Sequence, residues 1–185
     1  PDEKIANLVK MQQKRKSSIY YKGGVIRMTK RPRIVIVGSG FGGIKVARIL
    51  GECDVDITLI DRHNFHLFQP LLYQVSTSIL AVDEIAYPIR AFFRKQKNVE
   101  FFLAKADGVD MERKCVSTNH GEVEYDYLVL AAGATTNYFG MESVREYSYG
   151  MKTLAEALHI RNHVLHMFER SNKSKNEADR RRMLT

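Results

Sequence analysis

Short apolar runs alternate with a helical pattern in the first part of the chain. Arg33-Ile-Val-Ile-Val37 predicts a buried strand, and Ile57-Thr-Leu-Ile-Asp61 predicts a second one that ends in an acid. Between them lies an apolar pattern of helical period, with Ala47 and Leu50 on the side that faces the sheet. Gly51 is well placed to end this helix. The order strand, helix, strand is typical of a parallel α/β sheet.

Strand patterns return in the second half of the chain. Val99-Glu-Phe-Phe-Leu103 and Tyr125-Asp-Tyr-Leu-Val-Leu-Ala-Ala-Gly133 predict two more buried strands, the second of which opens into glycine. Turn signals between them predict that residues 105–126 form a small antiparallel β excursion. The patterns together predict a parallel sheet with a small antiparallel addition.

Two amphipathic helices are predicted outside this sheet. The first runs from Asp83-Glu84 to the basic residues 94–97, with Pro88 in its first turn. The second covers residues 153–170, and the polar residues 171–182 predict a linker or a frayed end. The second helix has one apolar face, formed by Leu154, Ala157, Leu158, Val164, Leu165 and Phe168.

A glycine motif links the first strand to the first helix. Gly38-Ser-Gly-Phe-Gly-Gly43 has G-x-G-x-x-G spacing and follows the strand directly. In such a motif Gly38 permits the tight turn, Gly40 lets a pyrophosphate approach the backbone, and Gly43 lets the helix pack close to the strand. The helix N-terminus favours phosphates, and Asp61, 18 residues after Gly43, is placed to accept hydrogen bonds from a ribose diol. The motif and its context predict a Rossmann-like dinucleotide-binding unit, without distinguishing FAD from NAD; a tight turn in another α/β protein is the alternative.

The stretch after Asp61 has an unusual composition. Arg62-His-Asn-Phe-His-Leu-Phe-Gln-Pro-Leu-Leu-Tyr-Gln74 is too apolar for a plain surface loop, while Pro70 and the mixed polarity argue against a regular element. This combination suits a segment that lines a pocket. The flat ring of a flavin needs such a wall, on which Gln69 would hydrogen-bond the ring edge and Pro70 would stiffen the backbone.

Histidines raise the question of a metal in two places. His63 and His66 could be a metal pair or an acid–base pair, but no third ligand lies nearby in the sequence. His159, His163 and His166 share the polar face of the last predicted helix, where exposure to water is favoured over metal binding. We therefore expect no metal site.

Composition places the chain among globular proteins of one ordinary domain. The 185 residues are 44% hydrophobic, with no apolar run long enough to cross a membrane and no apolar secretory signal. Cys53 and Cys115 form no CxxC redox pair, no zinc pattern and no disulfide framework. A cytoplasmic, reducing setting is the default expectation.

The net charge of +8 is confined to the start of the chain. Ten Lys and Arg against two acids among residues 1–33 account for all of it, so the remainder is neutral and no nucleic-acid partner is expected. We interpret residues 1–31 as a disordered basic leader rather than an arm for nucleic acid or a membrane surface. Met28 is also a candidate natural start, which mass spectrometry of the native N-terminus would test.

Beyond these patterns, residues 32–170 resemble the N-terminal, FAD-binding part of type II NADH dehydrogenases. These are single-polypeptide NADH:quinone oxidoreductases with the two-dinucleotide-binding flavoprotein fold. The most selective likeness is Asp61-Arg-His-Asn-Phe-His-Leu-Phe-Gln-Pro-Leu-Leu-Tyr-Gln74. Four further segments carry the resemblance: Ile34-Val-Ile-Val-Gly-Ser-Gly-Phe-Gly-Gly43, Ile85-Ala-Tyr-Pro-Ile-Arg90, Tyr125-Asp-Tyr-Leu-Val-Leu-Ala-Ala-Gly-Ala134 and Tyr138-Phe-Gly140.

The resemblance implies a role for each matching position around FAD. The glycine motif would hold the pyrophosphate, Asp61 the adenosine ribose, and Ala106 the adenine through its backbone. The flavin would accept hydride from NADH and pass two electrons to a quinone. The full set of implied cofactor-binding residues is Gly38, Ser39, Gly40, Phe41, Gly42 and Gly43 at the motif, Asp61, Arg62 and His63 beside the adenosine half, Gln69 and Pro70 beside the isoalloxazine, Ala106, and Ala131, Ala132 and Gly133 close to the cofactor.

The resemblance also implies parts that this chain does not contain. Family members are about twice as long, with a second Gly-rich unit for NADH and C-terminal amphipathic helices that dock on the inner face of the cell membrane. We therefore expect residues 32–152 to be an incomplete FAD-binding domain and residues 153–185 to lead toward an absent NADH-binding domain. Such a fragment would bind FAD weakly and would not oxidise NADH alone; a homodimer is left open.

Two other functional classes compete with this interpretation. One is a truncated, non-catalytic dinucleotide-binding module, and the other is a different FAD- or NAD(P)-dependent reductase of the same fold. Disulfide reductases and sulfide:quinone oxidoreductases need active-site cysteines, for which Cys53 and Cys115 are poorly placed. The flavin-like segment after Asp61 weighs against an enzyme that uses NAD alone.

Overall fold

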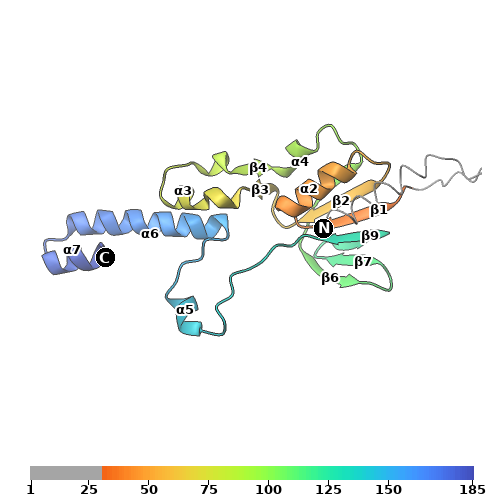
Figure 1. The fold of residues 1–185 in the computed structure, drawn as a ribbon. Helices are drawn as coiled ribbons and strands as arrows, with labels where there is room; N and C mark the ends of the chain where they lie inside the picture. Colours follow the sequence, from red (N-terminus) through yellow and green to blue (C-terminus); the bar gives the residue numbers. More distant parts are fainter. Residues whose placement is uncertain (1–30) are drawn as a thin grey trace, which may run out of the picture. The chain divides into compact units, whose positions relative to one another are not determined.

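The computed structural model describes residues 31–185, which form two compact units (Figure 1). The first unit holds the described residues up to Phe65 together with Pro88–Gly133, and the second holds His66–Tyr87 and Ala134–Thr185. The predicted leader and the Met28 start lie outside the described residues. The division at residue 152 stays a prediction.

The first unit is built on a four-stranded parallel sheet in the order β5-β2-β1-β9. This confirms the α/β class and the four strands read from the sequence. β9 differs in being half-exposed rather than buried, because it lies at the edge of this sheet, with β1 on one side only. The bounds are β1 (Arg33–Val37), β2 (Asp56–Asp61), β5 (Val99–Leu103) and β9 (Tyr127–Leu130).

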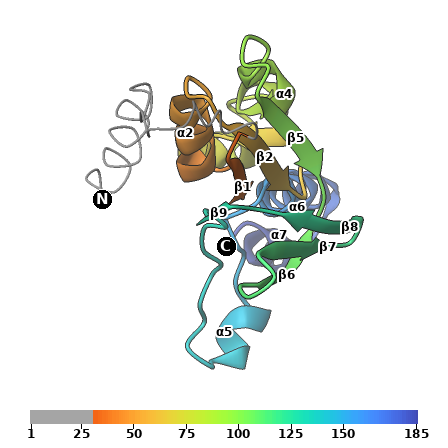
Figure 2. The ribbon, with the colours of Figure 1, turned by 90° about the vertical axis from the view of Figure 1, so that its right-hand side faces the viewer.

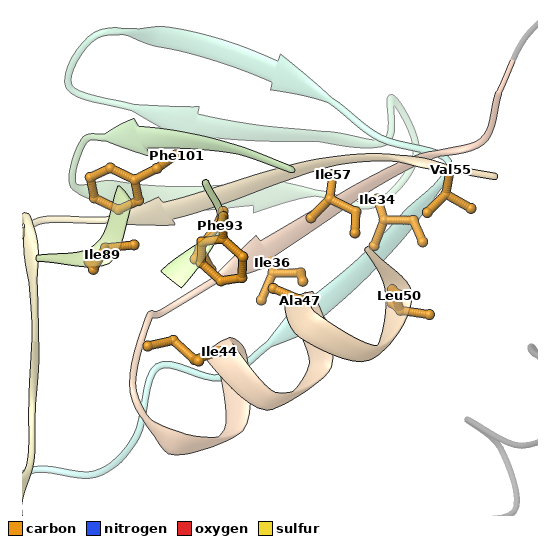
Figure 3. Close-up of a cluster of buried hydrophobic side chains, with 11 residues drawn as sticks. Ile34, Ile36, Ile44, Ala47, Leu50, Val55, Ile57, Ile89, Phe93 and Phe101 are labelled. Carbon is orange, nitrogen blue, oxygen red and sulfur yellow. The ribbon is translucent and has the colours of Figure 1, made fainter. Parts of the chain in front are cut away.

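Helix α2 (Phe41–Leu50) covers one face of the parallel sheet. Ile44, Ala47 and Leu50 point from the helix toward apolar side chains of β1 and β2 (Figure 3). Gly51 caps the helix as predicted, but its φ of −64° is ordinary helical backbone, and its N–H donates to the Ala47 carbonyl at 2.8 Å. The strand–helix–strand unit is therefore closed by a continuous apolar core.

The opposite face of the sheet is covered by an antiparallel sheet (Figure 2). Val116 and Tyr125 pack there with Val35 and Ile60, the strand residues that point away from α2. Parallel strands buried on both faces account for the unbroken apolar runs in the sequence. The predicted β excursion is confirmed as β6 (Ala106–Asp110), β7 (Cys115–Thr118) and β8 (Gly121–Glu124).

The prediction of a helix from Asp83 to the basic residues 94–97 is wrong. The chain instead forms η2 (Val82–Glu84), then β4 (Ala86–Pro88), which pairs with β3 (Phe65–Leu67), and then the four-residue α4 (Ile89–Phe92). Pro88 explains the change, because a proline drives the residue before it toward extended backbone. It therefore ends a strand and caps the short helix.

The second unit packs a short helical segment against a long helix. Helix α3 (Leu72–Ser76) contributes Leu72 and Val75 to an apolar cluster with Ala157 of α6 (Leu154–Lys173). The expectation that residues 62–74 lack regular structure is therefore wrong. Pro70 is accommodated in the first turn of η1 (Gln69–Leu71), where its missing N–H costs little.

The end of the chain is more helical than its polarity suggested. A helix α7 (Glu177–Met183) follows α6, where a linker was predicted. Asn176 starts it by accepting hydrogen bonds on its side-chain oxygen from the Ala178 and Asp179 amides. The predicted apolar face of α6 is covered only in its first turns: Val164, Leu165 and Phe168 are exposed. The remaining helix of this unit is α5 (Glu142–Glu146).

Helix α6 starts at a capping box that includes a titratable carboxylate, that of Glu156. The Glu156 carboxylate accepts hydrogen bonds from the Lys152 and Thr153 amides, both at 2.7 Å, while the Glu156 amide donates to the Thr153 hydroxyl. The bond from Lys152 first, and those from Thr153, hold the pKa of Glu156 below its ordinary value against partial burial, which raises it. The cap is therefore at full strength above the unfolded glutamate pKa.

We expect the start of α6 to loosen in acid. Because the folded pKa of Glu156 is lowered, its stabilising contribution is lost as the pH falls below about 4.3, the unfolded glutamate value, and through the folded pKa. Hydrogen exchange at the Lys152 and Thr153 amides, corrected for intrinsic rates, should accelerate over this range. In a Glu156→Gln control the same exchange should not change with pH in this way; a parallel response in both chains would contradict the assignment.

Candidate functional site

The glycine loop after β1 is shaped by backbone that other residues do not tolerate. Gly38 has φ +101°, and a Cβ there would collide with the carbonyl of Ala131. A Cβ on Gly43 would collide with the Gly38 carbonyl and lie 3.5 Å from Ile36 Cγ2. The tight turn and the close helix packing predicted for these two glycines are therefore present in the structure.

Gly40 differs from its neighbours because nothing lies within 4 Å of where its Cβ would be. It is the N-cap of α2, its backbone is extended at φ −70° and ψ −167°, and its carbonyl accepts from the Ile44 amide at 3.1 Å. It brings no side chain to cap the helix, and the first turn contains no acid. Open space beside an uncapped helix N-terminus is what a phosphate group requires.

The carboxylate of Asp61 lies beside this loop. Ser39 donates to Asp61 Oδ2 from its amide and from its hydroxyl, both at 2.7 Å. The His63 amide donates to Oδ1 at 2.8 Å, and His63 Nδ1 lies 3.5 Å from the same oxygen. The Asp61 side chain is 17% exposed, so the carboxylate is held in place and still reaches the surface. A ligand hydroxyl can approach it.

Backbone at the ends of neighbouring strands completes the first unit's site. The Gly38 amide donates to the Ile60 carbonyl and the Ala131 amide to the Val37 carbonyl, each at 2.8 Å. The Ala104 amide donates to the Asp61 carbonyl at 2.9 Å, two residues before the start of β6 at Ala106. The carboxyl ends of parallel strands are where α/β sheets bind ligands.

The predicted site residues divide between the two units. In the first unit, the structure brings together the glycine loop with Ser39, Asp61, His63 and Ala131. Their sequence neighbours Phe41, Arg62, Ala132 and Gly133 are exposed. Gln69 and Pro70 belong to the second unit, where the Gln69 amide donates to the Lys152 carbonyl at 3.3 Å. A role for these two residues beside a flavin ring stays a prediction.

Sequence reasoning missed how Asp61 is held. The motif defines its second position as any residue, so it gave no reason to connect Ser39 with the acid 22 residues later. The signal available was chemical: a hydroxyl residue between two glycines, beside a strand that ends in a carboxylate. The contact of the Ala104 amide with the Asp61 carbonyl had no side-chain signal at all.

The histidines of α6 and the two cysteines form none of the site contacts given above. The His159 and His163 rings lie 5.5 and 5.4 Å from the Tyr149 ring, and in residues 31–185 no three His, Cys, Asp or Glu side chains gather as metal ligands would. Cys53 is half-buried and Cys115 buried, and neither forms a disulfide. Burial raises the pKa of both thiols, which disfavours the reactive thiolate.

Comparison with known proteins connects this site to a family. Residues 32–173 match the family described as pyridine nucleotide-disulphide oxidoreductase. The type II NADH:quinone oxidoreductase Ndh of Mycobacterium tuberculosis is 43% identical over 160 residues, which cover 84% of this chain and 35% of that protein. This confirms the resemblance to type II NADH dehydrogenases.

Solved structures agree with this relationship. NDH2 from Plasmodium falciparum, in complex with NADH, has a TM-score of 0.69 at 28% identity and covers 82% of this chain and 32% of that one. The sulfide:quinone oxidoreductase from Aquifex aeolicus has a TM-score of 0.65 at 28% identity, covering 75% of this chain and 32% of that one. The chain spans about a third of the length of each of these three proteins. In the described residues, no helix is both long enough and apolar enough to span a bilayer.

The family match covers most of the chain, and it includes the glycine loop, the acid at the end of β2 and strand β9, which Ala131 follows. In the structure, these elements meet at the carboxyl ends of the parallel strands. The chain therefore belongs to the pyridine nucleotide-disulphide oxidoreductase family.

Proposed function

We propose that this chain is the FAD-binding part of a type II NADH:quinone oxidoreductase. The observation that carries the proposal is the open space at Gly40, at the N-terminus of α2, beside the held carboxylate of Asp61. A diphosphate flanked by a ribose fits these two features. The 43% identity to the Mycobacterium tuberculosis enzyme favours this member of the family.

The residues of the first unit fit the adenosine diphosphate half of FAD. The amides at the start of α2 would hold the pyrophosphate against Gly40, where the missing Cβ leaves room. Asp61 would accept from the ribose, His63 and Arg62 would flank the adenosine, and the backbone at Ala106 would contact the adenine. Ala131, Ala132 and Gly133 would line the approach; Gly133 has φ +76°, and nothing lies within 4 Å of where its Cβ would be.

The bound flavin supplies hydride acceptance and two-electron transfer, and the protein supplies its position. In the complete protein we propose NADH as the donor and a membrane quinone as the acceptor. Gln69 and Pro70 would border the isoalloxazine ring. We also propose a cytoplasmic enzyme attached peripherally to the inner face of the membrane, through regions outside this chain.

Other reductases of the same fold are less well supported. The sulfide:quinone oxidoreductase from Aquifex aeolicus is 28% identical, so the fold alone does not separate the classes. A dithiol mechanism requires accessible paired cysteines, and here Cys115 is buried while burial raises the pKa of both thiols. The cysteines therefore favour a flavin that exchanges electrons without a protein disulfide.

The test is flavin binding and turnover by the purified chain. We expect added FAD to give the shifted absorption spectrum of a protein-bound flavin, without NADH oxidation in the presence of a soluble quinone. A folded chain that leaves the FAD spectrum unchanged would contradict the proposed binding. Turnover by this chain would instead contradict the inference that the second dinucleotide-binding unit is required.

A further inference from the structure

The Asp61 carboxylate is already occupied on most of its acceptor positions. Ser39 donates two hydrogen bonds to Oδ2, one from its amide and one from its hydroxyl, each at 2.7 Å. The His63 amide donates a third bond, to Oδ1, at 2.8 Å. A carboxylate has about four lone-pair positions. His63 Nδ1 lies 3.5 Å from Oδ1, which is longer than an ordinary N–H···O hydrogen bond. One position therefore remains for a ligand, and it is on Oδ1.

Ser39 is the residue of the glycine loop that carries a buried polar side chain. Ser39 is 3% exposed, whereas Phe41 is 50% exposed. The hydroxyl therefore points into the protein, onto the acid at the end of β2, instead of outward to the space at Gly40. Short bonds to a carboxylate are the stronger class of hydrogen bond, and a buried hydroxyl holds this one without competition from water.

We propose that Ser39 is a positioning residue that fixes Asp61 so that the carboxylate offers a single acceptor, on Oδ1, to one hydroxyl of the adenosine ribose. This inference rests on the proposed FAD-binding function. The other ribose hydroxyl finds no acceptor on Asp61 while the Ser39 hydroxyl occupies Oδ2. Ser39 thereby sets which part of the ribose diol the protein reads, a specificity that the spacing of the glycine motif does not describe.

The first experiment compares three ligands on the full chain. FAD and its analogues lacking either the 2′- or the 3′-hydroxyl of the adenosine ribose are titrated against the wild type and Ser39→Ala. In the wild type we expect one analogue to bind about tenfold more weakly and the other within about twofold of FAD. In Ser39→Ala, the position that the hydroxyl occupies on Oδ2 is released while the amide of residue 39 still donates there, and both analogues should bind more weakly than FAD by similar factors.

Two results of this titration would overturn the proposal. One is an equal loss for both analogues in the wild type, which would mean that Asp61 reads both hydroxyls. The other is a Ser39→Ala variant in which all three affinities fall by the same factor, as a merely structural role predicts. Ser39→Ala removes one oxygen and adds no volume, so the variant does not overpack the loop.

The second experiment needs no ligand and separates this inference from the proposed function. Amide hydrogen exchange is measured at residue 39 and at His63, whose N–H groups both donate to Asp61. We expect Ser39→Ala to accelerate both several-fold, and Asp61→Asn to serve as the positive control. Unchanged exchange in Ser39→Ala overturns the positioning role. Failure of the folded wild type to bind FAD contradicts the proposed function, and accelerated exchange then still supports the contact.

Discussion

Replacing Gly43 with alanine should unfold the first unit, whereas replacing Gly40 with alanine should leave it folded and remove FAD binding. A Cβ at Gly43 collides with the Gly38 carbonyl, and backbone on both sides of this contact cannot move without opening the turn. We expect a loss of about 3 kcal/mol or more in the free energy of unfolding, at the upper end of overpacking costs. Urea unfolding followed by circular dichroism measures it.

Gly40→Ala is the matched variant because it alters the same loop by the same methyl group. The Gly40 backbone is extended, so alanine is tolerated, and nothing lies within 4 Å of its Cβ. The methyl group would instead occupy the space assigned to the pyrophosphate, so FAD affinity should fall about tenfold or more while stability stays within about 0.5 kcal/mol. Normal FAD affinity in a folded Gly40→Ala chain would contradict the assigned position of the pyrophosphate.

The second large effect is expected from the core of the parallel sheet. Leu59 of β2 is fully buried and belongs to the apolar cluster that α2, β1 and β5 also form. Truncation to alanine removes buried methyl groups and leaves a cavity, which costs about 2–5 kcal/mol. Urea unfolding should report this loss, and hydrogen exchange should accelerate across β1 and β2 while the amides of α3 and α6, in the second unit, remain largely unaffected.

Leu130→Ala provides the control for this prediction. It is the same substitution in a strand of the same sheet, but Leu130 is 67% exposed at the end of β9. Its effect should stay within about 0.5 kcal/mol. Similar losses for Leu59→Ala and Leu130→Ala would show that the sheet is not the stabilising core of the first unit.

The parallel sheet was predictable because its signals are local and redundant. β1 and β2 are nearly continuous apolar runs. The glycine motif between them and the acid at the end of β2 both indicate the same dinucleotide-binding fold. The helix predicted from Asp83 to the basic residues 94–97 had the right apolar spacing, but Pro88 and pairing with β3 decided the structure of this segment. Strand β3 lies too far back in the chain for its pairing to be detected from local periodicity.

The candidate site was predictable to the same degree. The roles of Gly38 and Gly43 follow from backbone sterics alone, which a motif encodes. The hydrogen bonds that Ser39 and the Ala104 amide donate to Asp61 join residues that are far apart in the sequence, so no local pattern predicts them. Helix α7 was missed because its charged composition indicated a linker, whereas the Asn176 side chain caps the helix and starts it.

The edge position of β9 has a consequence for handling this chain. An edge strand presents unpaired amides and carbonyls, and soluble proteins usually protect it with lysine, proline or a bulge. Tyr127-Leu-Val-Leu130 contains none of these, and its Tyr127 and Leu130 are 45% and 67% exposed. Within the described residues only β1 pairs with it. We therefore expect the strand to act as a template on which another extended segment can add, and this chain to self-associate at high concentration.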